Sequence, residues 1–208
     1  MQIFDMDGTL IDSNGIWKDV DTAFLARRGL PYTKEYYEGV AHTIFPLAAK
    51  FTKEFCRLPE SEEAIMAEWM DMAGDLYGTS VPVKPGVREY LEKLRSAGER
   101  MIVVTSAVPV HCRTALDHLG LTPYFERVIF AQELRREKKD PQLWRLSAEM
   151  MRVKPEDCTL YDDSVEACRG ARAAGMRAVG VFDPFFAGTE PEMRAVCDRY
   201  IRSFDELL

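Results

Sequence analysis

The stretch IFDMDGTLIDS, residues 3–13, places two aspartates directly after an apolar run. Asp5 and Asp7 follow a predicted strand, and Gly8 then allows a sharp turn. An isolated Asp-Gly pair is typical of a solvated turn, but carboxylates left unpaired at the end of a buried strand are electrostatically costly. The stretch therefore predicts that groups elsewhere in the chain offset this charge.

The composition is that of an ordinary globular protein. The chain has 208 residues, of which 47% are hydrophobic and 29% charged. A net charge of −7 without any basic run argues against binding to nucleic acid or to an anionic membrane surface. No apolar stretch approaches the ~20 residues of a membrane span, and no signal-peptide pattern is present, so we expect a cytoplasmic protein. The five scattered cysteines lack a CxxC spacing and are expected to be free thiols.

Residues 14–80 carry apolar residues at helical spacing and contain no convincing strand. In the segment that begins near Ile44, Leu47, Phe51 and Phe55 are expected to face inward. The predicted helices occupy residues 16–28, the segment between Thr33 and Gly39, the segment from Ile44 and the segment from Ser61.

After VPVKPG, residues 81–86, short apolar runs alternate with helical patterns. Such alternation is the signature of a parallel sheet covered on both faces. We predict an α/β fold with a Rossmann-like parallel-sheet core, residues 1–14 and 81–208, and an inserted all-helical cap domain, residues 15–80. The hinges would lie near residues 12–15 and 81–85. The expected strands include residues 2–4, 127–131, 158–163, 177–182 and 199–201 and the first part of 101–107.

The predicted strand ends bring polar residues to one edge of the sheet, where open parallel sheets bind ligands. Four carboxylates at one edge would repel strongly unless a hard cation lay among them. Oxygen ligands without a nearby histidine or cysteine favour Mg²⁺ over zinc. The residues at this edge are Asp5 and Asp7, Thr105 and Ser106, Lys138 and Lys139, and Asp162 and Asp163.

A lysine and a hydroxyl at the same edge suit a phosphoryl group, whose charge needs cationic and hydrogen-bonding partners. A carboxylate can attack phosphorus to give an aspartyl-phosphate. A second carboxylate two residues further on can protonate the leaving group and then activate water. Gly8 would expose backbone N–H groups to the anion. The pattern therefore predicts phosphoryl-transfer chemistry.

These motifs resemble a known family. DMDGTL, VVT, the lysine before DP and YDDS, in that order, resemble the four-motif set of the haloacid dehalogenase superfamily. The resemblance covers essentially the whole chain. PGVREYLEKLRSAG and DDSVEACRGARAAGM resemble the phosphoglycolate-phosphatase and β-phosphoglucomutase branch, in which a helical cap follows the first motif. The resemblance implies a Mg²⁺-dependent phosphatase that hydrolyses a small phosphomonoester through an aspartyl-phosphate.

The resemblance also implies roles for individual residues. Asp5 would be the nucleophile and a Mg²⁺ ligand, and Asp7 the general acid/base with its backbone carbonyl on the metal. Thr105 and Lys138 would hold the phosphoryl group, with Gly8 and Ser106 as further phosphate-binding positions. Asp162 and Asp163 would bind Mg²⁺ directly or through water. The register favours Lys138, although Lys139 stays open, as does the acid that contacts the metal directly.

The cap loop YEGVAHTI, residues 37–44, lies where related proteins place substrate-specificity residues. Gly39, His42 and Thr43 are the candidates, although a lone histidine is more often structural. The expected partner is a small phosphorylated metabolite, with no nucleic acid and no membrane, and the expected state is a monomer or weak homodimer.

Other functions remain as alternatives. A sugar phosphomutase could use the same site, but such relatives carry an arginine soon after the cap glycine, where this chain has Val40, Ala41 and His42. Dehalogenation is disfavoured by Asp7, where dehalogenases have an aromatic residue. Phosphonate-cleaving relatives lack the second motif aspartate and use a cap lysine. A non-catalytic phospho-accepting switch would need the acid pair on the first strand and no helical insertion.

Overall fold

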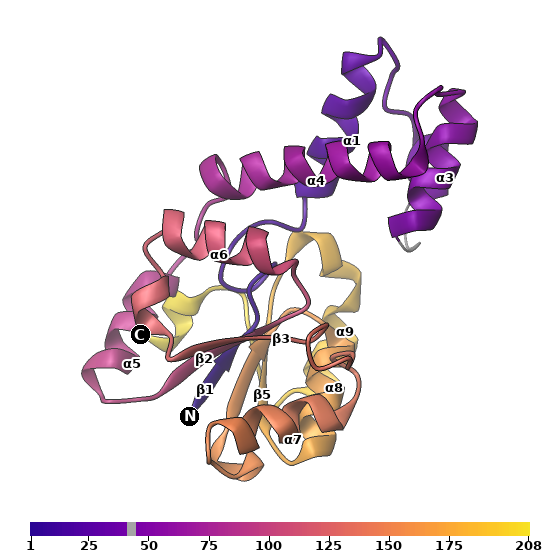
Figure 1. Cartoon of the computed structure of the whole chain (residues 1–208). Helices are drawn as coiled ribbons and strands as arrows, with labels where there is room; N and C mark the ends of the chain where they lie inside the picture. Colours follow the sequence, from indigo (N-terminus) through magenta and orange to yellow (C-terminus); the bar gives the residue numbers. More distant parts are fainter. Residues whose placement is uncertain (41–44) are drawn as a thin grey trace. The chain divides into compact units, whose positions relative to one another are not determined.

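The computed structural model of the chain describes residues 1–40 and 45–208. The chain divides into two compact units (Figure 1). The first, called the core unit below, contains Met1–Asn14 and Val81–Leu208, and the second, called the cap unit, contains Gly15–Ser80. Among the described residues, no helix combines the length and the apolar character needed to cross a membrane.

The core unit is built on a parallel sheet of six strands, counted over the described residues, in the order β3-β2-β1-β4-β5-β6. The chain adds β2 and β3 on one side of β1 and then returns to add β4, β5 and β6 on the other. The direction of winding therefore reverses between β1 and β4, which is where open α/β sheets bind ligands. The predicted parallel sheet is confirmed. The strands are β1 (Gln2–Phe4), β2 (Met101–Thr105), β3 (Arg127–Phe130), β4 (Thr159–Asp162), β5 (Arg177–Val181) and β6 (Arg199–Ile201).

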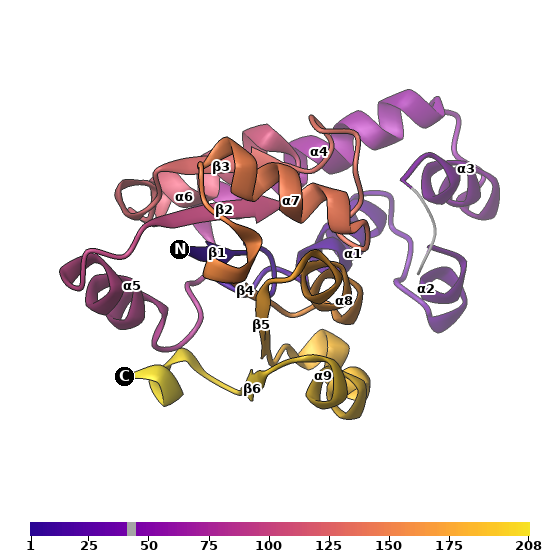
Figure 2. The same cartoon turned by 90° about the horizontal axis from the view of Figure 1, so that it is seen from below.

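Helices cover both faces of this sheet. Figure 2 shows α7, α8 and α9 on one side and α5 with the C-terminal turn on the other. Asp140 caps α7 by accepting a hydrogen bond from the Gln142 N–H, and Pro141 takes the first helical position. The elements are α5 (Val87–Ser96), α6 (Pro109–His118), α7 (Pro141–Met150), α8 (Val165–Ala174), α9 (Glu190–Val196) and the 3₁₀ turns at Thr122–Tyr124, Pro155–Asp157, Pro184–Thr189 and Phe204–Leu207.

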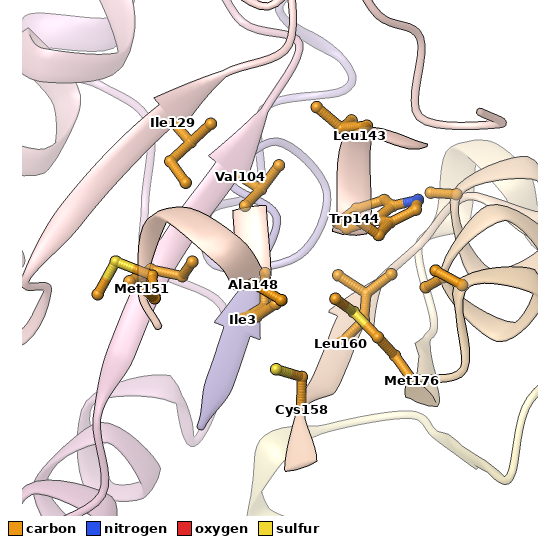
Figure 3. Packing of buried hydrophobic residues seen from close by; sticks show 14 of the residues in the cluster. Ile3, Val104, Ile129, Leu143, Trp144, Ala148, Met151, Cys158, Leu160 and Met176 are labelled. Atoms are coloured by element: carbon orange, nitrogen blue, oxygen red, sulfur yellow. The ribbon is translucent and has the colours of Figure 1, made fainter. Parts of the chain in front are cut away.

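The apolar interior between the sheet and α7 also positions the loop that carries Lys138. Ile3 and Leu160 from neighbouring strands pack with Leu143 and Trp144 of α7 (Figure 3). The buried Trp144 donates its indole N–H to the backbone carbonyl of Lys138 at 2.8 Å. This hydrogen bond attaches the loop after β3 to the core.

The opposite face of the sheet is aromatic. Phe4 of β1 stacks on Tyr161 of β4 with ring centroids 4.6 Å apart. The Tyr161 hydroxyl lies 2.6 Å from that of Tyr90 on α5, and Phe204 packs against all three rings. Aromatic packing of this kind contributes beyond the area it buries, so β1 and β4 are held together on both faces just before they deliver their acidic residues.

The cap unit is helical in its described residues, with α1 (Ile16–Arg27), α2 (Lys34–Val40), α3 (Phe45–Cys56) and α4 (Glu62–Thr79). The expectation for α3 is wrong in part. Leu47 and Phe55 are exposed, whereas Ala48, Ala49 and Thr52 are buried. Apolar residues occur around much of this helix, so spacing alone does not select its buried face, and the structure buries the side that carries its smaller residues.

A buried polar cluster joins three helices of the cap unit. The Tyr36 hydroxyl donates to Asp21 at 3.1 Å and lies 2.9 Å from the Thr52 hydroxyl. Tyr36 and Thr52 are fully buried. Burial raises the pKa of Asp21 from 3.8 to about 6, and the hydrogen bond from Tyr36 offsets only part of this effect.

Candidate active site

The exits of β1 and β4 place three carboxylates next to one another. The Asp5 N–H donates to the Tyr161 carbonyl at 2.9 Å, so the parallel pairing continues to the point where both strands end in aspartate. Asp5, Asp162 and Asp163 each offer an oxygen, and these oxygens lie within 4.8 Å of one another. All three residues are buried, with at most 4% of their surface exposed. Of the four carboxylates expected at this edge of the sheet, these three lie together.

Lys138 lies between two of these acids. Its ammonium is 2.6 Å from Asp5 Oδ1 and 2.9 Å from Asp162 Oδ2. Burial alone would lower the pKa of Lys138, but the charges of Asp162 and Asp5 outweigh it and raise the pKa. Lys139 instead pairs with the exposed Glu137 at the surface. Of the two lysines that the sequence left open, Lys138 is the one at the carboxylates.

One lysine does not neutralise three buried acids. Burial raises the pKa of Asp162 to about 7 against the opposing effect of Lys138, and burial together with the charges of Asp162 and Asp5 raises that of Asp163 well above 3.8. These carboxylates therefore hold protons tightly when no cation is present. An all-oxygen, buried and negatively charged cluster has the chemistry of a site for a hard divalent cation, and the residues fit Mg²⁺.

Three residues that sequence reasoning missed donate hydrogen bonds to Asp163 and Asp7. Asn14 donates its side-chain amide to Asp163 Oδ2 at 2.7 Å, and Ser13 donates its hydroxyl to Asp7 Oδ1 at 2.5 Å. Thr9 adds a longer contact to Asp163 at 3.4 Å. All three lie within residues 9–14, at the end of the first motif and directly after it, so a search for polar donors there could have identified them.

Gly8 has a conformation and a position that require glycine. Its φ is +74°, in the left-handed region. A Cβ atom at this residue would collide with the side chains of Asn14 and Asp163. The backbone after the first motif therefore lies directly against the acid cluster, which explains why no larger residue occurs there.

Thr105 and Ser106 end β2 differently. Thr105 is buried and its hydroxyl accepts a hydrogen bond from the Ala107 N–H at 3.0 Å, whereas Ser106 is exposed. The following helix begins at Pro109 with Val108 at its N-cap, so Thr105 does not cap it. Thr105 is the last residue of β2, which pairs with β1, so it lies at the same edge of the sheet as Asp5.

A protein-family model described as haloacid dehalogenase-like hydrolase matches residues 3–175. The chain belongs to this family. The match spans both the first motif and the acid pair at the end of β4, which contribute the carboxylate cluster. The predicted family and the expectation of a hydrolase are confirmed.

Similar proteins place this hydrolase near the predicted branch of the family. It is 25% identical over 85% of its length to a phosphorylated carbohydrates phosphatase of Thermotoga maritima, which it covers to 82%. It is 28% identical over 86% of its length to phosphoglycolate phosphatase 1 of Pseudomonas aeruginosa, which it covers to 68%. A crystal structure of a putative β-phosphoglucomutase from Thermotoga maritima superposes with a TM-score of 0.89 and 24% sequence identity. The match covers all of this chain and 95% of that chain, and it shows a similar fold.

The cap candidates of this hydrolase are only partly placed. Gly39 lies in α2, where a Cβ atom would collide with the Phe51 ring, so packing within the cap unit accounts for this glycine. His42 and Thr43 lie outside the described residues, 1–40 and 45–208. Their role in substrate specificity stays a prediction.

Proposed function

We propose that this hydrolase is a Mg²⁺-dependent phosphatase that acts on a small phosphomonoester through an aspartyl-phosphate on Asp5. The observation that carries the proposal is the buried cluster of Asp5, Asp162 and Asp163 around the Lys138 ammonium, at the point where the winding of the sheet reverses. Once a cation offsets the negative charge of the acids, the site can accept a negatively charged phosphoryl group.

The donor set supports Mg²⁺ as the cation. Asp5, Asp162 and Asp163, with the backbone carbonyl of Asp7, would hold it. When bound, Mg²⁺ would polarise the phosphoryl oxygens and offset their charge. The Asn14 side-chain amide donates to Asp163, and the Ser164 backbone N–H donates to Asp162. Hydrogen bonds of this kind commonly orient metal ligands.

In the first step, a carboxylate oxygen of Asp5 attacks phosphorus and the bond between phosphorus and the ester oxygen breaks. Lys138 holds Asp5 Oδ1 at 2.6 Å, which fixes the orientation of the nucleophile. Asp7, protonated at this stage, gives its proton to the departing ester oxygen, so the alcohol leaves neutral. The Ser13 hydroxyl fixes the Asp7 carboxyl group for this transfer.

In the second step, Asp7 acts as a base. It takes a proton from water as the water oxygen attacks phosphorus, and the bond between phosphorus and Asp5 breaks. Inorganic phosphate leaves, Asp5 returns as a carboxylate and Asp7 is protonated again. Thr105 and Lys138 would hold the phosphoryl oxygens through both steps.

The names of two relatives, a phosphorylated carbohydrates phosphatase and a phosphoglycolate phosphatase, support a substrate class. We propose a small phosphorylated metabolite of this kind. The net charge of −7 gives no general attraction for an anionic substrate, so the local cations must provide it.

Phosphate release from a panel of sugar phosphates and phosphoglycolate, with Mg²⁺ or with EDTA, tests the proposal. Asp5→Asn should abolish release, because an amide is a poor nucleophile. Asp12→Asn is the matched control, since Asp12 lies in the same stretch but is exposed. Mg²⁺-independent release, or release by Asp5→Asn at the wild-type rate, would contradict the proposal. Isomerised sugar phosphate without free phosphate would identify a mutase instead.

A further inference from the structure

We propose that Lys84, paired with Asp183, is a positioning residue for the active site, because its ammonium fixes the turn at Gly8 that follows Asp7. The inference rests on the proposed function for the role of Asp7, but it concerns residues that neither the motifs nor the family match assigns. Lys84 lies in the segment VPVKPG, which sequence reasoning treated only as a hinge.

The Lys84 ammonium has three acceptors. It donates to the Gly8 carbonyl at 2.5 Å, to the Phe182 carbonyl at 2.8 Å and to Asp183 Oδ2 at 2.8 Å. An ammonium has three donors, so this set uses all of them. The other oxygen of Asp183 accepts from the Phe185 N–H at 2.9 Å. Both charged groups are therefore held in one arrangement.

These contacts connect separate parts of the core unit. Gly8 follows β1, and Phe182 and Asp183 follow β5. β4 lies between β1 and β5 in the sheet. The ammonium thus connects the turns on either side of the strand that delivers Asp162 and Asp163. Moving either turn would change the space in which the carboxylates meet.

The backbone around Lys84 is fixed as well. Its N–H donates to the Leu10 carbonyl at 3.0 Å, and the Asp12 N–H donates to the Pro82 carbonyl at 2.9 Å. Ile11 and Val83 form an antiparallel bridge. The lysine therefore projects from a segment that is already paired with the tail of the first motif, which limits where its ammonium can lie.

Gly8 is confined from two sides. Its Cα lies so close to Asp163 and Asn14 that no Cβ would fit, and its carbonyl is held by Lys84. The Lys84 contact holds the peptide that follows Gly8, and the Gly8 N–H, which belongs to the peptide between Asp7 and Gly8, donates to the Ile11 carbonyl at 2.9 Å. We therefore expect Lys84 to determine the position of the Asp7 backbone carbonyl relative to the acid cluster.

Burial makes this pair effective. Only 10% of the Lys84 side chain and 1% of the Asp183 side chain are exposed. Charges in such surroundings are weakly screened, and removing one partner leaves the other buried without compensation. Lys84→Met alone would therefore mix a folding defect with any effect on the site. The double variant Lys84→Met/Asp183→Asn removes both charges and keeps the side-chain volumes close to the original.

The test measures Mg²⁺ binding by isothermal titration calorimetry and, separately, kcat and KM for p-nitrophenyl phosphate. For the double variant we expect Mg²⁺ affinity and kcat to fall by about tenfold or more, as is usual when groups that orient metal ligands are lost, while KM changes little. Lys84→Arg, which retains a cation and its donors, should recover part of both losses.

Lys93→Met is the matched control. Lys93 also donates to two backbone carbonyls, those of Leu207 and Leu208, but it is exposed and has no contact with the acid cluster among the described residues. It should leave Mg²⁺ affinity and kcat unchanged. A folded double variant with wild-type Mg²⁺ affinity and kcat would overturn the proposal, as would a double variant that does not fold, because the pair would then serve folding alone. If the wild type hydrolysed no ester, the proposed function would fail while the Mg²⁺ titration still decided the role of Lys84.

Discussion

Replacing Lys138 by methionine removes the cation that lies between two buried carboxylates. Its ammonium is 2.6 Å from Asp5 and 2.9 Å from Asp162, and the side chains of these acids are 6% and 0% exposed. Removing one partner of a buried ion pair costs about 3–5 kcal/mol. Because the pKa of Asp162 is already about 7, the acids can take up a proton, so we expect the lower end of this range.

A loss of about 3 kcal/mol corresponds to a decrease in Tm of roughly 6–12 °C for a chain of this size. Thermal unfolding followed by circular dichroism in EDTA at neutral pH measures it. Mg²⁺ should raise the Tm of Lys138→Met more than that of the wild type, since the added cation offsets the same carboxylates. The kcat for phosphate release should nevertheless fall by about 10²–10³-fold, because the group that holds the nucleophile and the phosphoryl oxygens is gone.

Lys139→Met is the control, because Lys139 is exposed and pairs with the exposed Glu137. Its effect on stability should stay within about 0.5 kcal/mol. Equal Tm values for the two variants in EDTA would refute the reasoning, since Lys138 would then contribute no more than a surface charge. A Tm of Lys138→Met that does not respond to Mg²⁺ would refute the assignment of the carboxylates to a cation site.

Two further predictions concern the backbone of the first motif and the buried acid of the cap unit. Gly8→Ala should lose about 1 kcal/mol of stability through its positive φ and, through its collision with Asp163, at least about tenfold in Mg²⁺ affinity by calorimetry. Gly98→Ala has the same backbone strain, at φ +73°, with open space around it, so it should lose stability alone; equal Mg²⁺ affinities of the two variants would exclude the collision as the cause. The folded protein binds the Asp21 proton more tightly than the unfolded chain does, so this residue makes the free energy of unfolding fall as pH rises from about 4 to about 6, by roughly 3 kcal/mol. Asp21→Asn should therefore have a higher Tm than the wild type at neutral pH and a similar Tm near pH 4. An equal Tm difference between variant and wild type at both pH values would contradict this.

Much of the core unit can be predicted because its central strands are short apolar runs followed by polar groups. MIVVT at 101–105 and TLYD at 159–162 are examples, and their ends converge because parallel strands share one edge. The position of Asp5 beside Asp162 follows from the same rule. Local pattern and topology agree at these residues, so sequence reasoning is sufficient there.

What could not be predicted depends on contacts between distant residues. Lys138 and Lys139 are chemically identical neighbours, and the choice between them depends on the anchoring of the Lys138 carbonyl by Trp144. Gly170 of α8 adds to this, because a Cβ there would collide with the same carbonyl. The acceptors of Lys84 lie at Gly8 and at Phe182 and Asp183, two segments far from Lys84 in sequence, so no local pattern reveals them.

The role of Asp5 as the nucleophile is tested most directly by trapping the phosphorylated enzyme. An acyl phosphate is reduced by borohydride to an alcohol, so a phosphorylated Asp5 would become homoserine, which peptide mass spectrometry locates. We predict homoserine at residue 5 after a quenched reaction of the wild type with Mg²⁺ and substrate, and none in Asp5→Asn. Phosphate release with homoserine at another aspartate would contradict Asp5 as the nucleophile. The absence of homoserine at every residue, when the kinetics require the intermediate, would contradict it too.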